Sequence, residues 1–257
     1  MTASPTPACR SGIPSRRKSA EVLTQATTAG REVGRALEDV FERLLARYGP
    51  QGWWPGDDRP FVVVVGAILT QAAAWKNVEK ALRNLERAGA LTPEGLLRLP
   101  EAELARLVYP AGYYNAKARK LKAFAEMLHV RCGGRLEGLF ALPLAELRRA
   151  LLETYGIGAE TADDIILYAA GRPVFVVDAY TRRISSRLGL KPAGYTYDAW
   201  QSFFIDRLPH DVPLFKEYHA LLVRHGKETC RREPLCAGCC LLEVCATGRE
   251  LVGGTGS

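Results

Sequence analysis

Long hydrophobic runs are missing from this sequence. Its longest apolar stretch, residues 61–69, is about half as long as a helix that crosses a bilayer. The first residues contain no apolar core of the kind that defines a signal peptide. We therefore expect a cytoplasmic protein that has no membrane partner.

A repeat of fixed period is also absent, which excludes a solenoid. Hydrophobic residues make up 47% of the chain and charged residues 25%, so disorder does not dominate it. Residues 61–69 are ambiguous, because four consecutive valines favour a strand while the helical context favours a buried helix, which is our prediction. Apolar residues recur at helical spacing in most other segments, which predicts an all-α fold with helices at 33–48, 75–88, 114–131, 143–155, 159–170, 178–188, 195–207 and 213–228.

The charge balance is positive. A net charge of +7 and a pI near 9.1 favour an anionic partner, because Lys and Arg that neutralise phosphates release counterions. A merely basic protein would have the same balance, so charge alone does not identify the partner. Residues 1–30 are rich in Ser, Thr, Pro and Ala and carry a small basic group, which predicts a disordered basic tail.

Cysteine is scarce outside one segment, since five of the seven cysteines lie between residues 230 and 245. The spacing Cys230-x5-Cys236-x2-Cys239-x5-Cys245 supplies four thiolates, a set that suits either tetrahedral zinc or a cubane iron–sulfur cluster. Cys240 could replace Cys239, but Cys239 preserves both the x2 and the final x5 interval. Nearby Lys227, Arg231 and Arg232 suggest that this loop also contacts phosphates.

A glycine-containing turn lies between two predicted helices. Gly156, Ile157 and Gly158 lead into the helix from residue 159, and such a turn can point several backbone N–H groups at one DNA phosphate. The same pattern also occurs in ordinary helix–helix turns. After the next apolar run, Asp178 stands at the start of another helix, where it could be only an N-cap.

The order of hairpin, helix, apolar run, Val-Asp and helix resembles the helix-hairpin-helix DNA glycosylases of the endonuclease III superfamily. The resemblance covers most of residues 33–248, and its further landmarks are Ile68-Leu69-Thr70-Gln71, Trp75-Lys76-Asn77-Val78, the segment 111–118, and the segment from His219 to Cys230.

This resemblance implies a six-helix barrel with the helix-hairpin-helix motif at 61–171, and a helical [4Fe-4S] domain at 31–60 and 172–248. It implies a monomer in the cytoplasm, associated with the nucleoid, that flips a damaged base out of double-stranded DNA. Asp178 matches the catalytic aspartate, and Gln71 would fill the gap that the flipped base leaves. It also favours [4Fe-4S] over zinc.

A departure from the family pattern limits the chemistry. Bifunctional members have a lysine in the second helix of the hairpin, which attacks the sugar as a Schiff-base nucleophile, and the matching residue here is Glu160. We therefore expect a monofunctional glycosylase, similar to the branch that removes alkylated purines such as 3-methyladenine. Such a cationic base would be attracted by aromatic rings, for which the candidates are Trp53, Trp54, Trp75, Tyr113 and Tyr114.

Two alternatives stay open. One is an endonuclease III that retains apurinic/apyrimidinic lyase activity on oxidised pyrimidines, with Lys117 or Lys120 as the substitute amine. The other is a catalytically weak DNA-binding paralogue. We interpret His219 and His225 as structural, because four cysteines already suffice for the metal centre.

Overall fold

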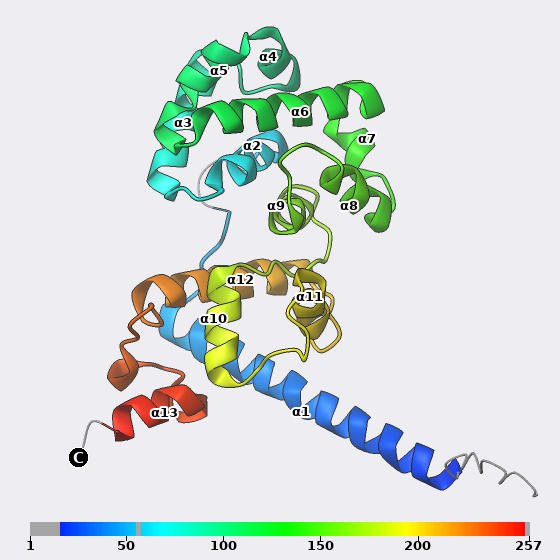
Figure 1. The fold of residues 1–257 in the computed structure, drawn as a ribbon, viewed down its shortest axis with the longest axis vertical. Coiled ribbons are helices and arrows are strands. Elements are labelled where there is room, and N and C mark those ends of the chain that lie inside the picture. Colours follow the sequence, from blue (N-terminus) through cyan, green and yellow to red (C-terminus); the bar gives the residue numbers. More distant parts are fainter. Residues whose placement is uncertain (1–15, 55–57, 255–257) are drawn as a thin grey trace, which may run out of the picture.

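The structure is a computed structural model that describes residues 16–54 and 58–254, and the side chains from residue 30 onward. All regular secondary structure in these residues is helical, so the predicted all-α fold is confirmed. Figure 1 shows two lobes, and the chain crosses between them before α2 and again before α10.

The first lobe is built from one continuous stretch of the chain (Figure 1). Its elements are α2 (Pro60–Thr70), α3 (Trp75–Arg87), α4 (Pro93–Arg98), α5 (Glu101–Leu107), the 3₁₀ turn η1 (Tyr109–Ala111), α6 (Tyr114–Cys132), α7 (Leu136–Phe140), α8 (Leu144–Leu152), α9 (Ala159–Asp164) and the π turn η2 (Ile165–Ala169).

The second lobe combines the first helix with the C-terminal third of the chain. Its elements are α1 (Arg16–Tyr48), α10 (Ala179–Leu188), α11 (Tyr197–Ile205), α12 (Val212–Glu228), the 3₁₀ turns η3 (Cys236–Gly238) and η4 (Leu242–Val244), and α13 (Ala246–Gly253). α1 packs along α12, where the hydroxyl of Tyr218 donates to the carbonyl of Leu37 at 2.8 Å. Helices from opposite ends of the sequence therefore share one core.

The valine-rich segment forms α2, as predicted. Pro60 occupies its first turn, a position that tolerates proline because the N–H there has no partner within the helix. Every residue from Val62 to Leu69 is buried, so burial on all sides outweighs the strand preference of valine.

Residues 16–30, where the sequence predicts a tail, form the first part of α1, which begins at Arg16. This segment contains neither glycine nor proline before Gly30, so nothing in it stops a helix from extending back from the amphipathic part. Residues 1–15 lie outside the described part of the chain. Four short helices, α4, α5, α7 and α13, were not predicted, because helices of five to eight residues are too short to display a clear period.

No described helix is both long and apolar enough to span a membrane.

Candidate active site and cysteine loop

The predicted hairpin joins α8 to α9. Gly156 has φ of +77°, a left-handed conformation that glycine adopts without strain, and Gly158 is the N-cap of α9. Ile157 is buried between them and anchors the turn in the core of the first lobe. The turn therefore presents the N-terminus of α9 at the surface, as a phosphate site requires.

Gln71, the residue after α2, lies against this hairpin. Its Nε2 donates to the carbonyl of Gly156 at 3.1 Å and to the hydroxyl of Thr161 at 2.9 Å, while Lys120 donates to its Oε1. Its amide thus holds the hairpin to α2. That Gln71 fills a gap in DNA stays a prediction.

Asp178 follows a completely buried apolar run, residues 174–177, and caps α10. Its Oδ1 accepts the backbone N–H of Thr181 at 2.7 Å, and its Oδ2 lies 3.8 Å from Nε2 of His219. Burial alone would raise the pKa of Asp178, but the interaction with His219 and its positive charge outweigh burial and hold this pKa below its ordinary value. One carboxylate oxygen is therefore used for the cap, and the other stays available for chemistry.

His219 lies on α12 and its side chain is only 7% exposed. Nδ1 is 2.7 Å from the hydroxyl of Tyr168, and the ring stacks on Trp53 at a centroid distance of 5.6 Å. Its Nε2 has no hydrogen-bond partner among the described residues. From the sequence alone His219 is interpreted as structural. No local sequence signal distinguishes it, because its proximity to Asp178 arises only in the folded chain.

Two further carboxylates extend this site. Glu160 and Asp164 are four residues apart on one face of α9. Glu160 is exposed and Asp164 is partly buried. Desolvation and the charge of Asp178 raise the pKa of Glu160. Burial, with smaller contributions from Glu160 and Asp178, raises the pKa of Asp164 to about 8. We call Glu160, Asp164 and Asp178 the carboxylate cluster.

The amines considered as substitutes for the missing lysine are engaged elsewhere. Lys117 is buried and donates to the carbonyl of Ala111 at 2.7 Å, and burial lowers its pKa to about 8. Lys120 donates to Gln71. The structure thus brings Glu160, rather than either lysine, beside Asp178.

Aromatic rings flank His219. Trp53 stacks with Trp54, and Trp54 contacts both Trp75 and Tyr168 at centroid distances of 5.4 and 5.3 Å. The indole N–H groups of Trp54 and Trp75 are buried without a hydrogen-bond partner among the described residues. Tyr113 and Tyr114 do not belong to this group, and Tyr113 is 74% exposed.

An ion pair that the sequence analysis missed fixes α9 relative to Asp178. Asp163 is completely buried and accepts hydrogen bonds from Arg148 of α8 at 2.9 Å and from Gln201 of α11 at 2.7 Å. Gln201 also donates to the carbonyl of Phe175, in the segment that leads to Asp178. The hairpin helix is therefore tied to both lobes.

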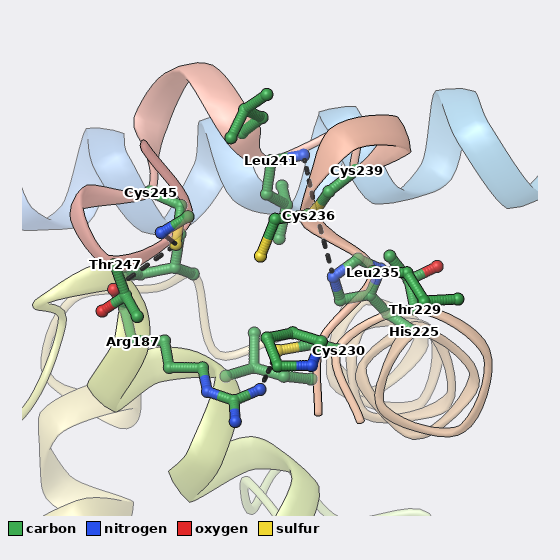
Figure 2. A pocket seen from close by; sticks show the side chains of 15 residues that line it. Arg187, His225, Thr229, Cys230, Leu235, Cys236, Cys239, Leu241, Cys245 and Thr247 are labelled. Carbon is green, nitrogen blue, oxygen red and sulfur yellow. Dashed lines mark hydrogen bonds between the residues drawn. The ribbon is translucent and has the colours of Figure 1, made fainter. Parts of the chain in front are cut away.

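The cysteine loop, residues 230–245, begins at the end of α12 and closes at the start of α13. Cys230, Cys236, Cys239 and Cys245 line one cavity that opens to solvent, whereas Cys240 is not part of its lining. Figure 2 shows the four thiols on different sides of this space. Within residues 16–54 and 58–254 no three His, Cys, Asp or Glu side chains converge as closely as a closed metal site requires.

Arginines of α10 fasten the cysteine loop. Arg187 lies 3.2 Å from the sulfur of Cys230 and donates to the carbonyls of Arg231 and Arg232 at 2.6 and 2.8 Å. Arg183 donates to the carbonyl of Cys230 at 2.9 Å. The sequence analysis missed both, because the arginines precede the loop by more than forty residues.

His225 joins this loop to α1. Its Nδ1 is 2.9 Å from the hydroxyl of Tyr48, and its Nε2 is 3.7 Å from the sulfur of Cys239. The predicted phosphate contacts Lys227 and Arg231 are both exposed close by. Arg231 bonds through Nε to the carbonyls of Lys227 and Glu228.

Comparison with known proteins agrees with the resemblance. Residues 65–205 match the profile of the HhH-GPD superfamily of base excision DNA repair proteins. A protein of Methanocaldococcus jannaschii, provisionally named a DNA repair glycosylase, is 44% identical over 80% of this chain and 94% of its own length. Endonuclease III of Treponema pallidum is 30% identical over 82% of this chain and 95% of its own.

Solved structures show the same fold. A non-covalent endonuclease III–DNA complex superposes with a TM-score of 0.74 at 21% identity, over 86% of this chain and 98% of that one. The H. pylori 3-methyladenine DNA glycosylase, bound to 1,N6-ethenoadenine, gives a TM-score of 0.64 at 27% identity, over 77% and 97% of the two chains. The chain belongs to the HhH-GPD superfamily and is a base excision repair DNA glycosylase of the endonuclease III superfamily.

Proposed function

We propose that this chain is a monofunctional DNA glycosylase, which hydrolyses the N-glycosidic bond of a damaged base and leaves the strand intact. The position of Glu160 carries the proposal, because it lies beside Asp178 where a Schiff-base lyase needs an amine. A carboxylate cannot form an imine with the sugar. The two amines considered as substitutes, Lys117 and Lys120, already have partners.

Asp178 would carry out the hydrolysis. Breaking the bond sends its electron pair to the departing base and leaves positive charge on the sugar, which a nearby carboxylate stabilises. Water then adds to the sugar carbon and gives its proton to the carboxylate. Because Oδ1 is occupied by the N–H of Thr181, Oδ2 is the oxygen that faces the reaction.

An alkylated purine is the substrate class that the aromatic group supports best. Such a base carries positive charge, and Trp53, Trp54 and Tyr168 form an aromatic group around His219, an electron-rich surrounding that would favour a cation. The H. pylori relative is named for 3-methyladenine, which is consistent with this class. A base that is already cationic also leaves readily, so it requires little help from the enzyme.

The residues of the cysteine loop fit a [4Fe-4S] cluster. Cys230, Cys236, Cys239 and Cys245 provide four thiols around one cavity, the number and type of ligands that such a cluster takes. Bound there, a cluster would cross-link the loop and stabilise its shape. Arg187 would place a positive charge beside the Cys230 ligand.

Double-stranded DNA with a damaged base is the proposed partner. Backbone N–H groups of Gly156 and Gly158 would hold one phosphate at the start of α9, while the N–H of Ile157 donates to the carbonyl of Thr154 within the turn. Lys227 and Arg231 would hold another near the cysteine loop, where both are exposed.

Duplexes that carry a single 3-methyladenine, oxidised pyrimidine or abasic site test this proposal, with and without borohydride. We expect release of the alkylated base, no borohydride-trapped adduct, and strand breakage only after alkali. A trapped adduct with the unaltered protein would contradict monofunctional chemistry. Release of an oxidised pyrimidine alone would contradict the substrate class.

Restoring the amine sharpens this experiment. Glu160→Lys should create a borohydride-trappable adduct and strand cleavage at abasic sites, because the new amine would lie beside Asp178. Glu137→Lys, an equal change of charge at an exposed position of α7, serves as the control and should create neither. Equal trapping by both variants would show that added positive charge, rather than position, is responsible.

A further inference from the structure

The carboxylate cluster needs a compensating cation. Glu160, Asp164 and Asp178 come from α9 and from the cap of α10, and their mutual repulsion is unfavourable in a partly buried site. Burial and neighbouring carboxylates act on Asp164, and no hydrogen bond from the described residues lowers its pKa. Glu160 adds negative charge here, and the amines of Lys117 and Lys120 are engaged elsewhere.

His219 is the buried group that faces the cluster. Its Nε2 is without a hydrogen-bond partner among the described residues and lies 3.8 Å from Oδ2 of Asp178. An unsatisfied buried nitrogen costs free energy unless it serves a ligand or a charge. Its direction therefore points to a role at Asp178.

The orientation of the ring is fixed from two sides. Tyr168 lies 2.7 Å from Nδ1, and Trp53 stacks on the ring face. Tyr168 itself is nearly buried on the π turn η2, a local distortion that is frequent at functional sites. With Nδ1 engaged, Nε2 remains directed at the carboxylate.

We propose that His219 is a positioning residue for Asp178, and that in its protonated form it replaces the cation of the missing lysine, keeping Asp178 ionised and its Oδ2 in place. This role rests on Asp178 being the catalytic carboxylate of the proposed function. It assigns to His219 an electrostatic task in glycosylase chemistry rather than a share in folding alone.

The charges around His219 agree with this role. Asp178 faces it from α10, Glu160 and Asp164 from α9, and Tyr168 from η2, while Lys216 and Glu217 neighbour Tyr168 on the helix of His219 itself. Burial lowers the pKa of His219, but Asp178, followed by Asp164 and Glu160, more than offsets burial and raises it. Arg182 is a further cation, and it acts on Glu160.

The sign of the pH effect follows. Asp178 must be ionised to act, so base release falls as the pH drops through the pKa of Asp178. Without the imidazolium, burial would raise that pKa, and loss of activity would begin at a higher pH. An opposite charge at this range changes a carboxyl pKa by about 1 to 3 units.

Nuclear magnetic resonance of the histidines in the full-length protein tests the proposal without any assay of activity. The chain has four histidines, and His219→Gln identifies the signal of His219. We expect His219 to titrate above the ordinary value of an imidazole, and Asp178→Asn to lower its pKa by about 1 unit or more. An ordinary pKa that does not respond to Asp178→Asn would overturn the proposal.

Base release then tests the consequence. Duplex DNA methylated with dimethyl sulfate is the probe, and single-turnover rates are measured from acid to neutral pH. His219→Gln should move the acid limb upward by about 1 unit or more, Tyr168→Phe should move it in the same direction by less, and His210→Gln, an exposed control, should leave it in place. A rate that falls equally at every pH in a folded His219→Gln protein would show a structural role only.

The two proposals fail separately. If the unaltered protein releases no base from this probe, the substrate class fails, and the histidine titration still decides the role of His219.

Discussion

Helix α12 carries two buried histidines whose surroundings repeat the same plan. His219 has Nδ1 against the hydroxyl of Tyr168 and Nε2 toward a carboxylate, and His225 has Nδ1 against the hydroxyl of Tyr48 and Nε2 toward the sulfur of Cys239. A tyrosine fixes each ring, and a carboxylate or a thiol lies on the other side. What differs is this second partner.

This difference suggests an electrostatic role for His219 and a structural role for His225. Three carboxylates raise the pKa of His219, and we propose that its positive charge keeps Asp178 ionised. His225 instead joins α1 to the cysteine loop, since Tyr48 is the last residue of α1. The same pair of side chains is therefore proposed to serve chemistry in the middle of α12 and the shape of the cysteine loop at its C-terminal end.

Removing the carboxylate of Asp178, which lies next to His219, should have the largest effect on base release. Asp178→Asn is expected to slow base release by about 10²- to 10⁴-fold, because an amide neither stabilises the cationic sugar nor accepts a proton from water. Asparagine caps a helix as well as aspartate does, so the melting temperature should stay within about 2 °C.

Asp211→Asn is the matched control, because Asp211 caps α12 through the N–H of Leu214 in the same way. If both variants lose activity, the loss reflects capping rather than chemistry. If neither does, Asp178 is not the catalytic residue.

Removing the thiol of Cys239, which lies next to His225, should affect the cysteine loop and the cluster proposed to bind there. Cys239→Ser is expected to lower the iron and sulfide content of the purified protein and to destabilise the loop, because serine is a poor ligand for iron. Cys240→Ser should keep both, since Cys240 does not line the cavity. Iron and sulfide analysis with visible absorbance measures this, and the reverse pattern would assign the ligand to Cys240.

Changing the second histidine itself should have the smallest effect on chemistry. His225→Gln removes one of the two partners of the Tyr48 hydroxyl, which keeps Thr229. The cost is about 0.5 to 1.5 kcal/mol, so the melting temperature should fall by a few degrees. The acid limb of base release should stay where it is, in contrast to His219→Gln. If His225→Gln and His219→Gln moved the acid limb of base release equally, the two histidines would not have different roles.

Features that depend on neighbouring residues in the sequence could be predicted, and features that depend on contacts between distant residues could not. The valines of α2 and the amphipathic helices could be predicted because burial leaves a pattern along the chain. The cysteine loop could be proposed because all four thiols lie in one short segment. Asp178 stood out because it follows a buried run.

The remaining features depend on folding. His219 gains a meaning only beside Asp178, and Asp164 becomes unusual only through its burial near Glu160. In the sequence Asp163 looks like an ordinary helix residue. Its buried contacts with Arg148 and Gln201, which lie on other helices, form only in the folded chain. Each of these contacts joins different elements, so no spacing rule along the chain could have predicted it.

The pairing of α1 with α12 also sets an order of assembly during synthesis. The first lobe is contiguous, so it can fold as soon as η2 leaves the ribosome. Tyr48 must wait for His225, 177 residues later, which takes about 10 to 30 s at ordinary rates of translation. The hairpin can therefore be complete before the cysteine loop has the helix that supports it, and any metal insertion would come last.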